Sequence, residues 1–352
     1  MGKRIAFVGV GALGGYVGGY LAHQGQDVTL IDMWPEHIEA IRSRGLELDG
    51  LTDEEKITVR SAKTMHLTEV QSLSKQAPID IAFVSVKSYD TEWATMMIKP
   101  YLAPTGFVVS LQNCMNEEKI ANIVGWGKTV GTIASVISVE LYEPGRIRRM
   151  VPKGGDKHTV FRVGEVHGIV TPRIEEVVKM LSGIDSSKVT TNLWGERWTK
   201  LCQNGMANGI AAATGMSGKA RDENTVIRRF SIKLGSEAVR VGQALGYQLV
   251  SIGKLDPERL ALAGEGHADA LAEVENYMMS RSAGNPRAGT QRPSMGQDMR
   301  KGRRTEIKLM NGFIAEKGAL MGVPTPAHER ITEVVLKVER GEIQPSPANL
   351  GG

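Results

Sequence analysis

Short apolar runs and segments with helical periodicity alternate along the first part of the chain. The strand-like runs, rich in Val, Ile, Ala and Phe, cover residues 3–8, 27–31, 79–86, 106–111 and 129–139. Helical spacing of apolar positions covers residues 16–23, 35–44, 90–102 and 117–124. Strands that are apolar at nearly every position are typical of a parallel sheet covered on both faces. The pattern therefore predicts an α/β domain with a doubly wound parallel sheet, the Rossmann arrangement.

Beyond about residue 185 the strand signals fade and helical periodicity takes over. A chain of 352 residues is also longer than one ordinary hydrophobic core supports. We therefore expect two domains. Residues 1–186 would form the dinucleotide-binding domain, and residues 187–352 an all-helical domain that carries substrate-binding and catalytic residues and a dimer contact.

A glycine-rich turn follows the first strand directly. It reads Gly9, Val10, Gly11, Ala12, Leu13 and Gly14. In a dinucleotide-binding turn the first glycine permits the tight bend and the second lets backbone approach the pyrophosphate. The third glycine allows the helix to pack closely on the strand, and the helix N-terminus supplies N–H donors. The order strand, turn and helix gives this common pattern its weight, and it predicts that residues 9, 11, 12, 13 and 14 bind the cofactor.

Asp32 ends the second strand, about 20 residues beyond the turn, as the dinucleotide fingerprint requires. A carboxylate there accepts both ribose hydroxyls of NAD and repels the 2′-phosphate of NADP. The next residues, Met33, Trp34 and Pro35, include no arginine to bind that phosphate. The alternative is a solvent-facing Asp that ends a strand and caps the next helix. We expect NAD(H) as cofactor, with NADP(H) as the alternative.

Two polar residues follow later strands of the predicted sheet, Lys87 in VSVKS and Asn113 in SLQNC. Each alone could be an ordinary strand-terminating residue. Ligands of parallel sheets bind beyond the carboxyl ends of the strands. Because the two residues end adjacent strands, we expect them at the nicotinamide end of the site.

Three polar residues share a spacing in the helical half. Lys200, Asn204 and Asn208 are four residues apart, and residues 201–218 carry no charge. This predicts one buried helix with a polar stripe over roughly 12 Å of its axis. Lys200 could instead extend from the helix end to solvent while the asparagines bond to backbone. Since unsatisfied buried polar groups are costly, we favour a stripe that faces a polar cleft.

A second polar constellation lies near the C-terminus. Ser294 and Gln297 have the spacing of a capping box, Gly302 would end that helix, and Glu306 would lie in the first turn of the next one. These structural roles explain both residues. A hydroxyl beside free helix N–H groups is, however, also a corner that binds carboxylates.

Composition narrows the class. Apolar residues make up 41% and charged residues 23%, the formal charge is +4, and no run reaches the roughly 18 apolar residues of a membrane helix. The two cysteines, Cys114 and Cys202, suit a reducing compartment, and no secretory segment is evident. The basic run 300–304 lacks interleaved aromatics, and the histidines lack ligand spacing. We expect a cytoplasmic protein without a metal site, nucleic-acid partner or membrane contact.

Taken with their order, five motifs resemble those of the ketopantoate reductase family, within the 6-phosphogluconate dehydrogenase-like group. They are GVGALGG, VSVKSYDT, SLQN, WTKLCQNGMAN and PSMGQDMRKGRRTEI, and they span most of the chain. The resemblance implies a Rossmann domain, an all-helical C-terminal domain and a substrate held in the cleft between them.

The resemblance also implies the roles of single residues. Lys200 would be the general acid for hydride transfer between nicotinamide and a carbonyl compound, and Glu306 would hold Lys200 or a substrate hydroxyl. Ser294 and Asn204 would fix the substrate carboxylate and hydroxyl. Asn208 matches the third polar position of the pattern, with a less defined binding role.

At the nicotinamide end, the resemblance implies that Asn113 and Lys87 flank the ring. Two features depart from the family. Asp32 stands where relatives that use NADPH carry a basic residue, and Cys114 stands where a glycine is usual. Cys114 and Met115 add bulk beside the site, so we expect a pocket that excludes ketopantoate. Cys114 has no activating histidine in the sequence, which argues against a nucleophile.

The sequence thus predicts an oxidoreductase that acts on a small hydroxy or keto acid or a secondary alcohol, mainly oxidising with NAD. The alternatives are ketopantoate reduction with NADPH, a dinucleotide-binding sensor without turnover, and a dehydrogenase that forms carbon–nitrogen bonds. We expect a small anionic or hydroxylated substrate and a homodimer. Segment 281–292 would be a mobile loop or a dimer contact, and the tail after Gly341 is expected to be loose.

Overall fold

The structure is a computed structural model, and it describes residues 2–283 and 293–351. Most of segment 281–292 therefore lies outside the described residues. Two compact units divide the chain, Met1–Leu193 and Trp194–Gly352. The sequence pattern had suggested a division after residue 186. Residues Ser187–Val189 form strand β12, which pairs with a strand of the first unit and extends that unit beyond 186.

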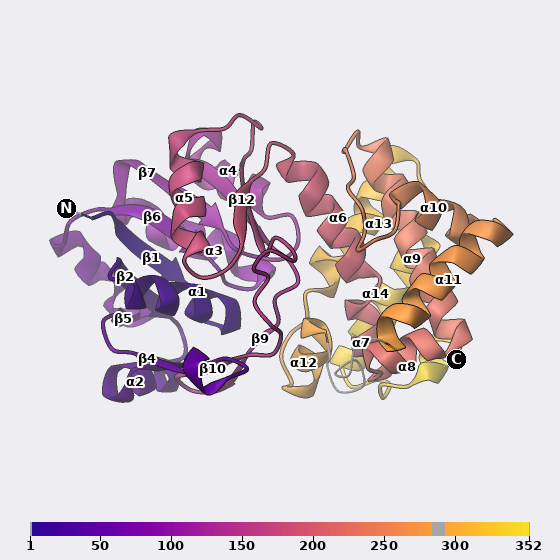
Figure 1. The fold of residues 1–352 in the computed structure, drawn as a ribbon, viewed down its shortest axis with the longest axis horizontal. Coiled ribbons are helices and arrows are strands. Elements are labelled where there is room, and N and C mark those ends of the chain that lie inside the picture. The colour runs from indigo at the N-terminus through magenta and orange to yellow at the C-terminus, as the bar shows by residue number, and fades with distance from the viewer. Residues whose placement is uncertain (1, 284–292, 352) are drawn as a thin grey trace. The chain divides into compact units, whose positions relative to one another are not determined.

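The first unit is built on an eight-stranded sheet with the order β12-β11-β8-β7-β6-β1-β2-β5 (Figure 1). Its strands are β1 (Arg4–Val8), β2 (Asp27–Asp32), β5 (Lys63–His66), β6 (Ile79–Val84), β7 (Leu102–Ser110), β8 (Thr129–Ala134), β11 (Phe161–Glu165) and β12. From β5 to β8 all neighbours are parallel, and β11 runs antiparallel to β8. The structure confirms the predicted parallel sheet. Strand β7 begins at Leu102 and so extends the predicted run at 106–111.

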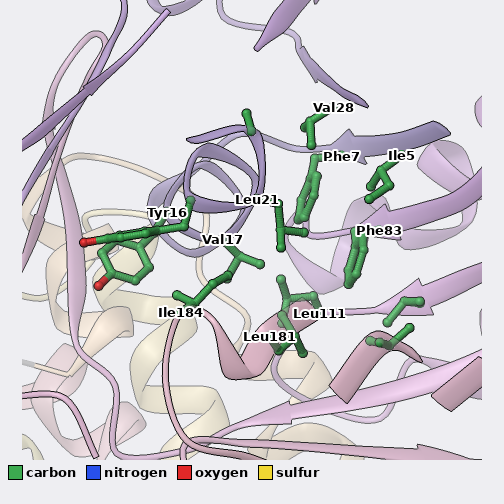
Figure 2. Close-up of a cluster of buried hydrophobic side chains, with 14 of the residues drawn as sticks. Ile5, Phe7, Tyr16, Val17, Leu21, Val28, Phe83, Leu111, Leu181 and Ile184 are labelled. Carbon is green, nitrogen blue, oxygen red and sulfur yellow. The ribbon is translucent and has the colours of Figure 1, made fainter. Parts of the chain in front are cut away.

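Alternate residues of the strands point into two separate cores, one on each face of the sheet. On one face Ile5 and Phe7 of β1 are buried with residues of the first and fifth helices, and Phe7 stacks on Phe83 at 4.5 Å (Figure 2). On the other face Ala6 and Val8 are buried with residues of the third and fourth helices. The helices are α1 (Ala12–His23), α2 (Pro35–Arg44), α3 (Thr91–Ile98), α4 (Glu117–Val124) and α5 (Pro172–Ser182). Covered on both faces, the sheet is doubly wound as predicted.

A second, four-stranded sheet was not expected from the sequence. Its order is β4-β3-β10-β9, with β3 (Leu46–Asp49), β4 (Ile57–Val59), β9 (Val139–Glu143) and β10 (Arg146–Arg149). It packs on α1 so closely that a Cβ on Gly19 would lie 2.8 Å from Leu46, and one on Gly15 would lie 2.5 Å from Ile147. These strands are three to five residues long and rich in charged residues, so they lack the apolar runs that mark the main sheet.

The second unit is helical in its described residues, as predicted. Its helices are α6 (Leu193–Gly205), α7 (Asn208–Thr214), α8 (Gly218–Glu223), α9 (Thr225–Ala244), α10 (Pro257–Glu265), α11 (Ala268–Ala283), α12 (Ser294–Arg300), α13 (Asn311–Met321) and α14 (Pro326–Glu339). Trp198 of α6 is fully buried, and its indole N–H donates to the carbonyl of Ala238 on α9 at 2.9 Å. In the described part of the chain no helix has the length and apolarity needed to cross a bilayer.

A buried polar chain fixes the end of α6 against the C-terminal helices. The side-chain amide of Asn311 lies 3.0 Å from the carbonyl oxygen of Gly205 and 3.1 Å from Nδ1 of His328. Nε2 of His328 lies 2.8 Å from the carbonyl oxygen of Leu234. The contacts are satisfied together when Nε2 carries the proton and Nδ1 accepts from the amide. A protonated His328 would place two donors against each other.

Acid is therefore expected to destabilise the fold through His328. Burial lowers the pKa of this imidazole to about 4 from its ordinary value of 6.5. The unfolded chain takes up a proton below pH 6.5 that the folded protein refuses until about pH 4, so stability falls as the pH falls through this window. At pH 5 the contribution is about 2 kcal/mol less favourable than at pH 7.5.

Urea unfolding of the protein and of His328→Gln, each from pH 5 to 7.5, measures this effect. The free energy of unfolding should depend less steeply on pH in the variant, because His328 no longer titrates while every other group remains. Equal slopes in the two proteins would contradict the assignment.

Candidate functional site

The glycine turn has the geometry that a dinucleotide requires. A Cβ on Gly14 would lie 2.2 Å from the carbonyl oxygen of Gly9 and 2.3 Å from Oγ of Ser85, so the start of α1 lies directly on the strands. Gly11 is different, because a Cβ there would meet no atom within 4 Å, and its φ of −65° suits any residue. Neither backbone conformation nor crowding inside the protein explains glycine at this position. Space for a ligand at this position is what the dinucleotide pattern predicts.

The first residues of α1 lie next to the open space beside Gly11. Ala12 and Leu13 open the helix, and no side chain caps it at Gly11. The first N–H groups of a helix have no carbonyl acceptor within the helix, and they carry its positive dipole end. The turn residues predicted from sequence thus gather at the carboxyl end of β1, where N–H groups and open space would suit a pyrophosphate.

Asp32 is bound to this turn. One carboxylate oxygen accepts the N–H of Val10 at 2.6 Å, and the other accepts the N–H of Trp34 at 2.9 Å. Each carboxylate oxygen has a second acceptor position, so the side chain can still receive two hydroxyls. The alternative drawn from sequence, a solvent-facing Asp that ends a strand and caps the next helix, holds in part. Asp32 ends β2 and bonds the residue before α2, but its side chain is half-buried.

His37 also holds the turn in position. This fully buried imidazole places Nε2 2.9 Å from the carbonyl oxygen of Val10, and Nδ1 accepts the N–H of Gly145 at 2.8 Å. Burial lowers its pKa, so it stays neutral and Nε2 carries the proton. The Trp34 ring stacks on it with centroids 5.7 Å apart. His37 connects the turn to the small sheet, a role that no pattern in the sequence indicated.

The side chains around Asp32 offer little positive charge. His66 is its register partner on β5, with Nε2 3.0 Å from the carbonyl oxygen of Met33. Nδ1 of His66 accepts the N–H of Thr68 at 3.4 Å and lies 2.9 Å from the Thr68 hydroxyl oxygen. Arg42 of α2 forms ion pairs with both Glu39 and Glu69. The cation that follows Asp32 along the chain is thus already neutralised.

The segments after β6 and β7 are joined by side-chain amides. The amide of Gln112 donates to the carbonyl oxygen of Val86 at 2.8 Å. The amide of Asn116 donates to Ser88 Oγ at 3.0 Å and to the carbonyl oxygen of Asn113 at 2.7 Å. These bonds hold the segment that carries Lys87 against the one that carries Asn113. The two predicted residues therefore lie on adjacent strand ends, and Gln112 and Asn116 are supports that the sequence did not distinguish from ordinary loop residues.

Cys114 has a left-handed backbone conformation with a φ of 63°, although it is not glycine. The cysteine is 4% exposed and follows Asn113 directly. This conformation explains why a glycine would suit the position, as the departure from the family suggested.

The structure corrects the expected single helix through Lys200, Asn204 and Asn208. Helix α6 ends at Gly205, and α7 begins at Asn208 after a break at Met206 and Ala207. Lys200 and Asn204 share α6, but Asn208 lies on the other helix, so the three do not form one continuous stripe. Spacing alone could not reveal the break, although the glycines on either side of it, Gly205 and Gly209, are residues that weaken a helix.

Asn208 is buried within the second unit. Its amide lies 3.6 Å from the sulfur of Met310, and a Cβ on the next residue, Gly209, would lie 3.2 Å from Ile307. The α6–α7 corner therefore packs on the segment 307–311, which directly follows Glu306. Asn208 thus has a structural contact, and its binding role stays a prediction.

The predicted capping box at Ser294 is wrong. Ser294 is the first residue of α12, Pro293 occupies the cap position, and no side chain caps the helix. The end of the helix is as expected, because α12 stops at Arg300 and Gly302 has a φ of 61°. Glu306 precedes the 3₁₀ helix Ile307–Leu309 instead of lying in its first turn. Proline before a helix can begin it without a side-chain cap, and the spacing rule overlooked this.

Among the described residues, no group of three or more His, Cys, Asp or Glu side chains gathers as metal ligands do. Hydrogen-bond donors at a helix N-terminus, an acceptor at the end of β2 and amides at the next strand ends are the kinds of group that bind an organic cofactor. A strand, glycine turn and helix followed by an acid define the class, a protein with a Rossmann dinucleotide-binding fold.

The chain belongs to the ketopantoate reductase family. The family model described as ketopantoate reductase PanE/ApbA matches residues 5–160, and its C-terminal counterpart matches residues 192–339. The 2-dehydropantoate 2-reductase of Pyrococcus horikoshii is 29% identical over 92% of this chain and 93% of its own length. That of Archaeoglobus fulgidus is 28% identical over 96% and 99%. The chain is therefore an oxidoreductase of the class that acts on CH–OH groups.

Solved structures share the fold over nearly the whole chain. A PanE/ApbA family ketopantoate reductase from Ralstonia eutropha has a TM-score of 0.77 at 24% identity, covering 97% of this chain and 99% of that one. A D-mandelate dehydrogenase in a ternary structure with NADH and anilino(oxo)acetate has a TM-score of 0.78 at 21% identity, covering 96% and 99%. At this identity the likeness concerns the fold alone.

Alanine substitutions at two glycines of the turn should distinguish a glycine needed for cofactor binding from one needed for packing. Gly11→Ala places a methyl group in open space, so the free energy of unfolding changes by no more than about 1 kcal/mol while NADH binding weakens at least about tenfold. Gly14→Ala drives a methyl group into Gly9 and Ser85 and lowers stability by about 2 kcal/mol or more. Urea unfolding and fluorescence titration with NADH measure both effects. Unchanged NADH affinity in Gly11→Ala would show that the open space is not the cofactor's.

Proposed function

We propose that the chain is an NAD-dependent dehydrogenase that oxidises a small hydroxy acid or secondary alcohol to the carbonyl compound. The observation that carries this proposal is the Asp32 carboxylate, held at the end of β2 by the N–H groups of Val10 and Trp34. Held in this way, its remaining acceptor positions suit the two hydroxyls of an adenosine ribose.

The same carboxylate disfavours NADP. A 2′-phosphate would bring at least one negative charge to within a few ångströms of Asp32, which costs about 1 to 4 kcal/mol at an exposed or half-buried site. The first cation after Asp32 along the chain offers little compensation, because Arg42 is paired with two glutamates. The charge balance therefore favours NAD by roughly tenfold or more.

Bound NAD would supply the acceptor for the hydride that leaves the substrate carbon. In this direction Lys200 receives the proton that the substrate hydroxyl gives up, so it acts as a neutral amine; in reduction the same side chain is the general acid. Glu306 would hold Lys200 or a substrate hydroxyl, and Ser294 and Asn204 would bind the substrate's polar groups. Asn113, held by the amide of Asn116, would flank the nicotinamide ring.

Two further points support this function. The D-mandelate dehydrogenase with the same fold was solved with NADH, so the fold is compatible with a cofactor that lacks the 2′-phosphate. Cells also keep NAD largely oxidised, which favours the direction from alcohol to carbonyl. A homodimer remains a prediction from the sequence.

The second candidate is reduction of ketopantoate. It is favoured by the curated relatives that are 2-dehydropantoate 2-reductases, at 24–29% identity over 92–96% of this chain. The strained Cys114 beside Asn113 argues for a differently shaped pocket. Activity with ketopantoate and NADPH, compared with a panel of hydroxy acids and secondary alcohols with NAD, separates the two candidates.

Asp32 should set the cofactor preference. The unmodified enzyme is expected to use NAD with a kcat/KM at least about tenfold higher than NADP. Asp32→Asn removes the negative charge but keeps one carbonyl acceptor, so the ratio should fall toward one. The matched control is Asp27→Asn at the other end of β2, which should leave the ratio unchanged. A preference of the unmodified enzyme for NADP would contradict the proposal.

Lys200 should be needed for turnover and not for cofactor binding. Lys200→Ala is expected to lower kcat by about 10²- to 10⁴-fold and to leave the Kd for NADH within about twofold. Lys219→Ala, which removes an exposed lysine of the same unit, serves as the control. Full activity in Lys200→Ala would refute the assignment. An unmodified protein that binds NADH but converts no substrate of the panel would favour a sensor.

A further inference from the structure

Two residues hold a backbone conformation that is unfavourable for their side chains. Within residues 2–283 and 293–351, the non-glycine residues with positive φ are Cys114 at 63° and Val136 at 53°. The left-handed region is costly for any residue with a Cβ, and especially for a β-branched residue such as valine. Such conformations persist only where the surrounding structure maintains them, and they concentrate at ligand-binding sites.

Both residues lie at the same edge of the main sheet. Strands β7 and β8 are parallel neighbours, and Ser110 pairs with Gly131. Cys114 follows Ser110 by four positions and Val136 follows Gly131 by five, so both stand just beyond the carboxyl ends of adjacent strands. Parallel sheets bind their ligands at this edge. It is also the edge that carries Asn113.

The residues on either side of Val136 are held by a hydrogen bond and by core packing, whereas the Val136 side chain is exposed. The N–H of Ser135 donates to the carbonyl oxygen of Val160 at 2.8 Å, and Ile137 packs against the buried core that includes Phe7. Between these anchors the Val136 side chain is 63% exposed. A single exposed valine is ordinary. An exposed valine that is also left-handed adds backbone strain without a gain from burial in its own unit, and glycine would remove that strain.

A contact with substrate would account for the side chain. We propose that Val136, at the sheet edge marked by the second strained residue Cys114, forms an apolar wall of the substrate site, which receives the alkyl or aryl group on the carbon that gives up hydride. The proposal rests on the proposed function and names its substrate class: 2-hydroxy acids whose substituent is apolar and larger than a methyl group. Covering an isopropyl group with such a substituent removes apolar surface of both partners from water.

The test compares a small and a large substrate in one enzyme. With NAD, the unmodified enzyme should oxidise 2-hydroxyisovalerate with a higher kcat/KM than lactate. Val136→Ala removes two methyl groups and should lower the ratio of these two values about tenfold, because a methylene contact in an apolar pocket is worth about that much in kcat/KM. The Kd for NADH should stay within about twofold. Val170→Ala, at an exposed valine after β11 with ordinary backbone, should leave the ratio unchanged.

The outcomes separate this proposal from the one it rests on. If the unmodified enzyme oxidises the panel but Val136→Ala changes both kcat/KM values by the same factor, the apolar wall is refuted and the dehydrogenase stands. A preference for lactate in the unmodified enzyme also refutes the wall alone. If NAD oxidises secondary alcohols but no 2-hydroxy acid, the apolar wall alone is refuted. If neither class of substrate is oxidised with NAD, while NADH still binds, both proposals fail.

Discussion

The cofactor-binding end of this protein depends on the bonds that fix one peptide unit, Val10, in the glycine turn. Its N–H is held by the carboxylate of Asp32 and its carbonyl by the buried imidazole of His37. A hydrogen bond to a charged group contributes about 1.5 to 3 kcal/mol, and a buried backbone group left unpaired costs a similar amount. Asp32 therefore does two things at once. It sets the shape of the turn, and it presents acceptors of fixed direction to the ribose.

The connection extends beyond the turn. Nδ1 of His37 accepts the N–H of Gly145, which joins the turn to the small sheet packed over α1. Trp34 donates to Asp32 through its backbone and stacks on His37 through its ring. A change of charge at Asp32 consequently acts on the turn, on the start of α2 and on the small sheet together. For this reason an asparagine, which keeps an acceptor, isolates the electrostatic effect better than an alanine does.

In the second unit, too, a buried polar side chain fixes a backbone group by a hydrogen bond. The corner between α6 and α7 leaves the carbonyl of Gly205 without a helical partner, and the amide of Asn311 supplies the donor. Asn311 begins α13, a few residues after Glu306, and its amide also reaches His328. One buried amide thereby relates the helix that carries Lys200 and Asn204 to the segment that carries Glu306. Placement of the proposed catalytic groups follows from packing inside this unit.

Much of the fold could be predicted from the sequence, because its signals are local. The apolar strands announce a parallel sheet, and helix 117–124 begins and ends as its periodicity indicates. The small sheet could not be found, because its short strands are stabilised by packing on Gly15 and Gly19 rather than by an apolar run of their own. The break at Met206 and the proline that replaces a cap at Ser294 are likewise settled by tertiary context.

The sequence predicts the candidate site residues themselves better than the residues that hold them in position. The glycines and Asp32 follow a fixed spacing, so they can be predicted from the sequence. His37, Gln112 and Asn116 each bond to a group at least 26 positions away along the chain, and their types occur in many loops. The left-handed conformations of Cys114 and Val136 are properties of φ, which a sequence does not display unless glycine marks them.

The most direct test of the account is an experimental structure with NADH bound. Both adenosine ribose hydroxyls should lie within about 3 Å of the Asp32 carboxylate oxygens, while the N–H groups of Val10 and Trp34 keep their bonds to this carboxylate. A ribose that contacts neither oxygen, or an Asp32 side chain turned away from Val10, would contradict it.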